Sequence, residues 1–205
     1  MKTRTAGQRT KAKIARVSEK VFAEKGFDAA RVDDIAKKAG VNKALIYYYF
    51  DSKENLLKEV LQVNALEIVK AIEEDFENAN QENSALTFDF YMSIIDHLKR
   101  KRNVLKILMY EMLNPSNKKP MIFDILDMTF QSLKKLIDRS GNKIEDEETY
   151  KLNHFFYHFI PSMSFILIGD KYCNTYNVDY DNSFDKFIEA FHSLKLWSYV
   201  PSDKK

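Results

Sequence analysis

The sequence holds a single cysteine, Cys173, so no disulfide can form within the chain. It also holds only five glycines and four prolines among 205 residues, while apolar residues make up 45%. Glycine and proline are the residues that interrupt regular structure most strongly. Their scarcity therefore favours an all-α fold of long helices over a fold rich in sheets and turns.

Other absences limit the function. No apolar run is long enough to span a bilayer, and no apolar segment follows the basic N-terminus, so we expect neither a membrane helix nor a signal peptide. A cytoplasmic protein with no membrane partner is the simplest interpretation. The chain also lacks a glycine-rich phosphate loop, a nucleophile elbow and a paired-cysteine motif. We therefore expect neither an enzyme nor a bound cofactor.

The charge is small overall but unevenly distributed. The net charge is +2, yet residues 1–53 carry 13 Lys and Arg against 6 Asp and Glu, a balance of +7. The remaining residues carry 19 against 24, a balance of −5. This asymmetry favours a nucleic-acid surface near the N-terminus over a generally basic protein.

Residues 31–53 have the pattern of two short helices joined by a tight turn. Apolar residues recur at helical spacing in the first: Val32, Ile35, Ala36 and Ala39. Gly40 is suited to end that helix, and Asn42 is suited to the N-cap of the next. In the second helix Ile46, Tyr49 and Phe50 share one face. This is the helix-turn-helix pattern, whose second helix enters the DNA major groove.

The other face of the second helix carries the polar groups. It holds Lys43, Ala44, Tyr47 and Tyr48. Phenol hydroxyls and an ammonium can bind phosphates, and a small alanine lets the backbone approach a base edge. The alternative is a solvated helical hairpin in some other all-α protein. The pattern favours DNA binding, with Asn42 at the same helix end and Lys53 near the start of the following helix, where a phosphate could lie.

A longer set of segments is continuous and correctly spaced over about residues 10–60. It comprises Phe22-Ala23-Glu24-Lys25-Gly26-Phe27, Val32-Asp33-Asp34-Ile35-Ala36, Ala39-Gly40-Val41, Tyr47, Tyr49-Phe50, Ser52-Lys53-Glu54 and Leu56-Leu57. This set resembles the N-terminal domain of the tetracycline-repressor (TetR) family. The resemblance implies a dimeric, all-helical bacterial transcription regulator, usually a repressor that a small ligand releases from DNA.

Two positions depart from the family pattern. Arg31 stands where members often have Thr or Ser, so it cannot cap the first short helix with a hydroxyl and is expected to reach DNA instead. Ala44-Leu45 stands where members often have Gly-Thr, which removes a hydroxyl donor and leaves the operator sequence open.

The whole chain is expected to form about nine helices. A DNA-binding domain is expected over residues 1–53 and a helical ligand-binding and dimerisation domain over residues 54–205. Thr10 is expected to cap the first helix, Ser52 the fourth, and Pro161 to kink the eighth. Residues 170–181 are expected to form a loop. The helices are expected over residues 10–25, 32–39, 43–50, 52–76, 84–98, 104–113, 120–140, 145–168 and 183–199.

The second domain is rich in aromatic residues, most of them expected in the core. Some would line any ligand cavity, and the resemblance implies a small-molecule effector there. The candidate pocket residues are Phe90, Tyr91, Tyr110, Phe123, Phe130, Phe155 and His158. His154 and His158 lie four residues apart but lack a third ligand at a matching spacing, so helix packing or pocket polarity is favoured over a metal site.

The last two helices carry apolar stripes too broad for one subunit to bury. Candidate residues of a homodimer interface are Phe156, Phe159, Met163, Phe184, Phe187 and Phe191.

The favoured function is a repressor that binds a palindromic double-stranded operator. An activator or a corepressor-dependent repressor is an alternative. An alternative from another class is a helical ligand carrier or an enzyme whose helix-turn-helix no longer binds DNA. Such a protein would have no reason to keep Lys43, Tyr47, Tyr48 and Lys53 together.

Overall fold

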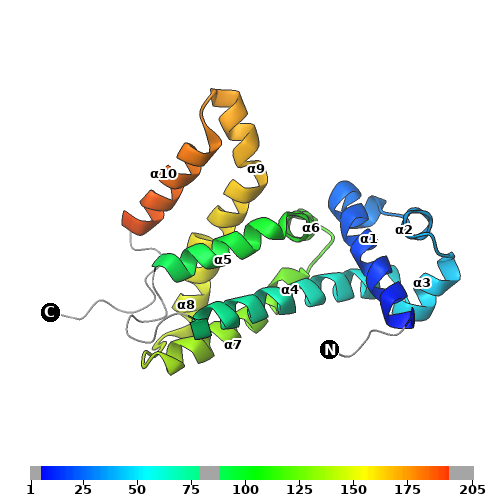
Figure 1. Ribbon diagram of the computed structural model, residues 1–205, viewed down its shortest axis with the longest axis horizontal. Helices are drawn as coiled ribbons and strands as arrows, with labels where there is room; N and C mark the ends of the chain where they lie inside the picture. Colours follow the sequence, from blue (N-terminus) through cyan, green and yellow to red (C-terminus); the bar gives the residue numbers. More distant parts are fainter. Residues whose placement is uncertain (1–5, 79–87, 194–205) are drawn as a thin grey trace. The chain divides into compact units, whose positions relative to one another are not determined.

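The computed structural model describes residues 6–78 and 88–193, and helices are the only regular structure in those ranges (Figure 1). Since α8, η1 and α9 run on without a break, the described residues form nine helices, as predicted, and the backbone of α1 is interrupted at Gly26. The elements are α1 (Ala6–Ala29), α2 (Val32–Ala39), α3 (Lys43–Phe50), α4 (Lys53–Asn78), α5 (Phe88–Arg100), α6 (Arg102–Leu113), α7 (Met121–Arg139), α8 (Glu147–Asn153), η1 (His154–Phe159), α9 (Ile160–Tyr176) and α10 (Tyr180–Ser193).

The chain divides into two compact units. The first unit comprises Met1–Glu67 together with Asn103–Ile125, and the second comprises Ile68–Arg102 together with Leu126–Lys205. The first therefore includes the helix-turn-helix, most of α6 and the start of α7. The predicted domain boundary after residue 53 stays a prediction, because it concerns which segment binds DNA.

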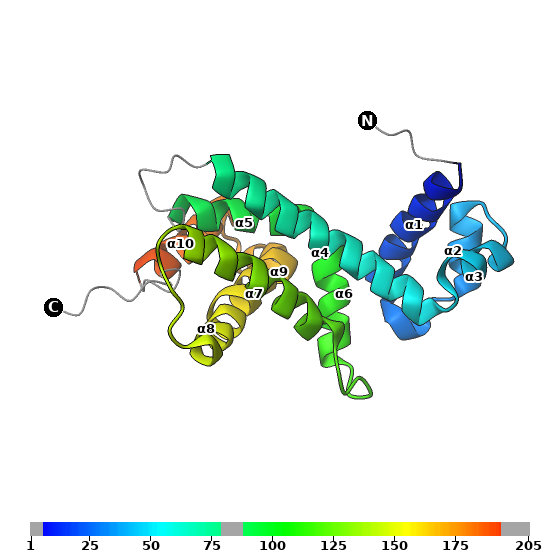
Figure 2. The same cartoon turned by 90° about the horizontal axis from the view of Figure 1, so that it is seen from below.

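The core of the first unit is built from helices that each bury one apolar face. Side chains from five helices are fully buried in it: Ile14, Phe22, Ile35, Ile46, Leu56, Leu61, Leu105 and Ile107. Figure 2 shows α2 and α3 packed beside α1. Eight residues are too few for a stable isolated helix, so packing against α1 holds α2 and α3 in place.

Local signals set most of the helix ends in this unit. Gly40 has φ 64°, the left-handed conformation expected at the end of α2. The Asn42 side chain accepts from the Leu45 amide at 2.7 Å, and Ser52 Oγ accepts from the Asn55 amide at 3.0 Å, so both predicted N-caps are confirmed. The prediction for Thr10 was wrong: α1 begins at Ala6, and the Thr10 hydroxyl donates to the Ala6 carbonyl one turn back.

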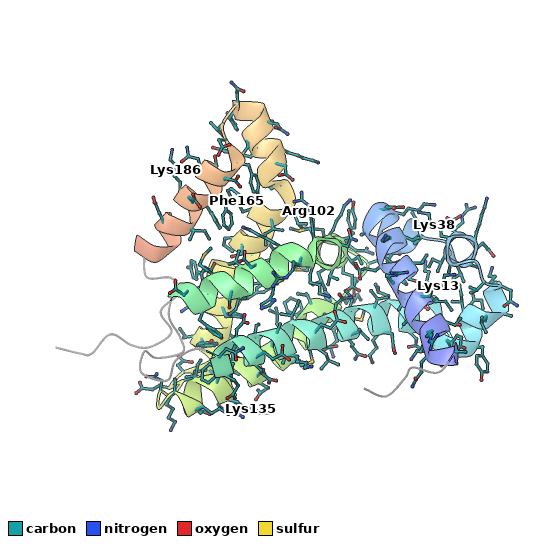
Figure 3. The ribbon with its side chains drawn as sticks, in the orientation of Figure 1. Lys13, Lys38, Arg102, Lys135, Phe165 and Lys186 are labelled. Carbon is teal, nitrogen blue, oxygen red and sulfur yellow. The ribbon has the colours of Figure 1, made fainter. Side chains whose placement is uncertain are left out.

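The second unit contains the hairpin of α9 and α10. Phe165 of α9 packs against Phe184 and Phe187 of α10, with ring centroids 5.4 and 4.8 Å apart (Figure 3). The crossing requires Gly169, because a Cβ there would lie 2.9 Å from Phe165 and 3.0 Å from Tyr180.

The loop predicted over residues 170–181 was wrong. The helix α9 continues to Tyr176, and only three residues separate it from α10. Cys173 is buried and continues the apolar face of the helix beyond Gly169. Asn177, with φ 51°, ends α9 in the left-handed conformation.

Pro161 lies directly after an unusual helical segment. Residues His154–Phe159 form a π-helix, between α8 and α9. Proline has no amide hydrogen to donate to the preceding turn, so the normal bonding pattern is interrupted there. The predicted kink stays a prediction, and the structure shows a local widening of the helix before Pro161. Such widened turns often occur at functional sites.

Candidate nucleic-acid interface

The helix α3 presents its apolar side to the core and its polar side to solvent. Ile46 and Phe50 are buried, whereas Tyr48 is 78% exposed and Tyr47 41% exposed. Lys43 and Ala44 are also exposed. The faces are therefore divided as the sequence pattern predicted, and four candidate contact residues share an accessible surface that spans two turns.

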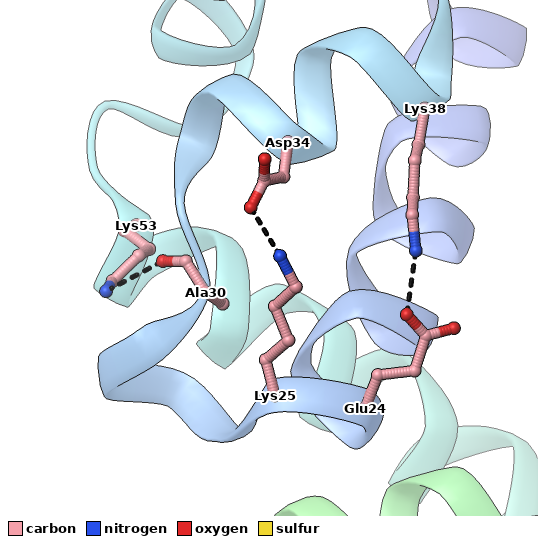
Figure 4. A network of polar contacts seen from close by, with 6 residues as sticks. All are labelled: Glu24, Lys25, Ala30, Asp34, Lys38 and Lys53. Carbon is pink, nitrogen blue, oxygen red and sulfur yellow. Dashed lines mark hydrogen bonds and ion pairs between the residues drawn. The ribbon is translucent and has the colours of Figure 1, made fainter.

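Two ion pairs connect α2 with α1. Lys25 Nζ lies 2.7 Å from Asp34, and Lys38 Nζ lies 2.7 Å from Glu24 (Figure 4). These lysine hydrogen bonds lower the pKa values of the Asp34 and Glu24 carboxyls, so both stay ionised at neutral pH. Because both pairs are exposed, they add little to the packing of α2 on α1, which depends mainly on the buried apolar face of α2.

A third ion pair connects α2 with α3. Lys43 Nζ donates to Asp33 Oδ2 at 2.9 Å, and both side chains are largely exposed. The hydrogen bond to Asp33, supported by the carboxylate charge, raises the pKa of the Lys43 ammonium. Asp33 was not among the predicted site residues. Its ten-residue separation from Lys43 becomes a contact only through the geometry of the turn.

Lys53 is directed into the protein. Its ammonium donates to the Ala30 carbonyl at 3.2 Å (Figure 4). It also donates to the Phe27 carbonyl at 2.9 Å and lies 3.5 Å from the Asp28 carbonyl. It also lies 4.2 Å from the centre of the Phe27 ring. The predicted phosphate contact stays a prediction, because a phosphate would have to compete with these carbonyls.

Arg31 and Asn42 occupy the ends of the short helices. Arg31 is the N-cap residue of α2, and its side chain makes no capping bond there, as the sequence indicated. It is exposed. Asn42 caps α3 through its side-chain oxygen, which leaves its NH₂ group as the donor that could contact DNA.

The comparisons with known proteins agree with this geometry. Residues 14–60 match the sequence signature described as "Bacterial regulatory proteins, tetR family". The N-terminal domain is a TetR-family domain. The predicted resemblance is thereby confirmed, and the helix-turn-helix of α2 and α3 is the part of the TetR domain that carries the exposed polar face.

Relatives with assigned roles match part of the chain. The HTH-type transcriptional repressor NicS of Pseudomonas putida is 35% identical over 104 residues, which cover 45% of this chain and 49% of NicS. The negative transcriptional regulator IcaR of the biofilm operon icaADBC in Staphylococcus aureus is 46% identical over 39 residues, which cover 19% of this chain and 21% of IcaR. The chain thus matches about half of NicS and a fifth of IcaR.

Solved structures extend the similarity in fold to the rest of the chain. The regulator FadR of Bacillus subtilis, crystallised with stearoyl-CoA, superposes with a TM-score of 0.67 at 20% identity and covers 92% of this chain and 98% of FadR. A regulator from Aquifex aeolicus gives a TM-score of 0.65 at 19% identity, with 90% and 99% covered. At these identities the likeness concerns the fold, which is the all-helical TetR fold.

The predicted pocket residues do not all lie together. Tyr91 and His158 meet in the second unit with ring centroids 6.0 Å apart, and the Tyr91 hydroxyl lies 2.9 Å from Ser162 Oγ. Phe90 and Phe130 are buried in the same unit, and Phe155 is partly buried there. Tyr110 and Phe123 are exposed residues of the first unit.

Burial keeps both histidines of this group neutral. It lowers the pKa of His154 to about 4 and, with a smaller contribution from the neighbouring His154, the pKa of His158 to about 3. The rings stack along one side of the helix, 6.2 Å apart. Within the described ranges, no group of three or more His, Cys, Asp or Glu side chains is arranged to hold a metal ion.

The candidate dimer residues fall into three groups. Phe156 is 59% exposed and Phe159 and Phe187 are partly buried, whereas Met163 and Phe184 are buried within the unit. The side chain of Phe191 lies outside the described part of the structure.

Among the described helices, none is long and apolar enough to cross a membrane.

Proposed function

We propose that this protein is a transcriptional repressor that binds a palindromic operator as a homodimer and is released by a small, largely apolar or aromatic ligand. The carrying observation is the exposed polar face of α3 in a TetR-family domain, where Lys43, Tyr47 and Tyr48 are accessible. Lys43 and Ala44 lie in the first turn, where base edges are closest, and Tyr47 supplies a phosphate contact.

A row of exposed apolar residues supports the homodimer. Large apolar side chains are exposed in two groups along the continuous helix of α8, η1 and α9, three near its start and three near its end: Leu152, Phe156 and Tyr157, then Ile168, Tyr172 and Tyr176. We call this set the exposed stripe. A monomer would leave the stripe in water, which is unfavourable, whereas a second copy would cover it. One helix-turn-helix also contacts too little DNA for tight specific binding, so two must act together.

The second unit supports a ligand of low polarity. Its interior combines aromatic rings with a few neutral polar groups, the Tyr91 and Ser162 hydroxyls and the two neutral imidazoles. Ligand sites usually have this composition. FadR was crystallised with stearoyl-CoA, so a long-chain acyl-CoA is a reasonable first compound to test.

The test has two steps. Genomic footprinting with the purified protein should protect a palindrome whose half-sites are about one DNA turn, roughly 34 Å, apart. Stearoyl-CoA, free stearate and coenzyme A are then titrated against the protein on that DNA. Release by one of them supports a ligand-released repressor, while tighter binding would indicate a corepressor. The absence of any protected palindrome would contradict DNA-dependent regulation.

A further inference from the structure

We infer that Asp33, a residue of α2, determines operator specificity by directing the ammonium of Lys43 on the recognition helix. The inference rests on the proposed function, because it assumes that α3 enters the major groove. It concerns a residue that lies outside the recognition helix and carries a charge that DNA repels. The sequence alone gives no reason to assign it a role in base selection.

The contact is well defined. Asp33 Oδ2 accepts from Lys43 Nζ at 2.9 Å, and Lys43 lies in the first turn of α3. A lysine side chain has four rotatable bonds and can otherwise reach many acceptors. The bond to Asp33 restricts the ammonium to one region of the α3 surface, next to the first turn, where base edges approach.

The pair also opposes nonspecific binding. On random DNA, a free Lys43 would bind whichever phosphate is nearest, and an unpaired lysine adds to sequence-independent affinity. When Lys43 is paired with Asp33, its ammonium must break the bond to the carboxylate before it can bind a phosphate. An exposed ion pair is weak, so a well-placed guanine with its two acceptors can draw the ammonium away or share it. Asp33 thus lowers affinity for wrong sequences more than for the right one.

The neighbouring acid provides a matched control. Asp34 has the same charge, lies in the same turn of α2 and is also paired with a lysine, but its partner is Lys25 of α1 at 2.7 Å. Asp33→Asn and Asp34→Asn therefore remove the same charge one residue apart. Only the first frees a group on the recognition helix, so a general charge effect changes both variants and a directing effect changes one.

The experiment measures binding of each variant to the wild-type operator and to random-sequence DNA over a range of salt concentrations. For Asp33→Asn we expect affinity for random DNA to rise ~3–10-fold and the salt slope to steepen by about one unit, because one more lysine is available to phosphates. The ratio of operator to random affinity should fall ~10-fold. For Asp34→Asn the ratio should stay within about twofold of wild type.

A double variant and a stability measurement serve as further controls. Asp33→Asn added to Lys43→Ala should leave the affinity ratio of Lys43→Ala unchanged, since the directed group is already gone. Thermal unfolding of each variant checks the fold, and Asp33 is exposed, so little change is expected. An unchanged ratio in Asp33→Asn, or equal losses in both asparagine variants, would overturn the inference. Wild-type protein that binds no operator would instead overturn the proposed function.

Discussion

At the scale of single residues, the position of Lys53 suggests a role different from that of a typical surface lysine. Its ammonium donates to the carbonyls of Phe27 and Ala30, in the short segment that follows the break in α1 at Gly26. A buried or partly buried carbonyl that accepts a hydrogen bond from an ammonium is well satisfied. Lys53 therefore connects the start of α4 with the segment between α1 and α2.

The first prediction concerns this bond. Lys53→Met keeps the length of the side chain but removes the donor, so the first unit should lose ~1 kcal/mol of stability and melt a few degrees lower. Operator affinity should fall by similar factors on all sequences, with an unchanged salt slope. Lys53→Arg should restore most of the stability. A salt slope reduced by about one unit in Lys53→Met would instead show the phosphate contact predicted from sequence.

The second prediction concerns Tyr47. Its ring lies on the exposed face of α3, so the hydroxyl can bind a phosphate without any change in the core. Tyr47→Phe should weaken binding to all sequences about 3–10-fold and leave thermal stability unchanged. Tyr49→Phe is a useful comparison, because Tyr49 lies on the other side of the helix and is partly buried. A changed operator consensus in Tyr47→Phe would indicate base contact.

At the scale of elements, the continuous helix of α8, η1 and α9 carries both polar and apolar functions. It bears the neutral polar side chains of His154, His158 and Ser162 as well as the exposed stripe. His158 is 4% exposed, and its ring packs edge-on against Tyr91. The buried imidazoles and the residues proposed for the dimer interface therefore belong to one helix.

The third prediction follows from the buried histidines. Because the folded pKa values of about 4 and 3 lie below the ordinary value of 6.5, both imidazoles take up protons on unfolding in mild acid. Their contribution to stability is complete above pH 6.5 and is lost as the pH falls toward 4. Unfolding free energy should drop by ~1–3 kcal/mol between pH 7 and pH 5. Denaturant titrations at several pH values measure this drop.

The control removes the titrating groups. A His154→Gln/His158→Gln variant should lose most of the dependence between pH 7 and pH 5, even if it is less stable overall. Carboxylates also titrate in acid, but they do so equally in the wild type and the variant, so the difference between the two curves isolates the histidines. Parallel curves would mean that the imidazoles are not neutral in the folded state.

The sequence predicted these elements unevenly, for physical reasons. Gly40, Asn42 and Ser52 act on backbone groups within three or four residues, so their roles are visible in a local pattern. The pairs Lys43–Asp33 and Lys53–Ala30 depend on how helices pack, and no spacing in the chain shows them. The loop expected over residues 170–181 was wrong because α9 continues to Tyr176, and the burial of Cys173 in that segment depends on packing that a local pattern does not show.

At the scale of the whole molecule, the fold and the exposed polar face of α3 were predictable from the sequence, while the DNA contacts and the residues of a ligand pocket stay predictions. The helix-turn-helix face is defined by one short segment. A pocket is formed by residues from several helices, and two of the predicted residues, Tyr110 and Phe123, proved to be exposed in the other unit. Aromatic content indicates where an interior is but not which rings border a ligand.

The fourth prediction concerns the dimer. Phe156→Glu/Tyr172→Glu places two charges on the exposed stripe, where the wild-type side chains are 59% and 56% exposed. We expect a folded monomer that loses operator binding by at least about tenfold, because one helix-turn-helix makes too few contacts. Sedimentation and DNA binding measure the two effects. Phe187→Glu is a poorer test, since Phe187 stacks on Phe165 within the same subunit.

Charges elsewhere on the surface provide the comparison. Lys171→Glu changes an exposed residue next to Tyr172 and should leave the protein dimeric and able to bind DNA. A double variant at Phe156 and Tyr172 that sediments as a dimer would show that the subunits meet at another surface.

The ion pair between Asp33 and Lys43 also bears on how operator preference can evolve. If base selection depended on α3 alone, a new operator preference would require a substitution within this helix of eight residues. Each of its residues either packs against the core or lies on the face that is proposed to contact DNA. A directing group on α2 adds a second route, since exposed Asp33 can be replaced without loss of core packing. Two regulators with the same recognition helix could then diverge in their target genes through a substitution ten residues upstream.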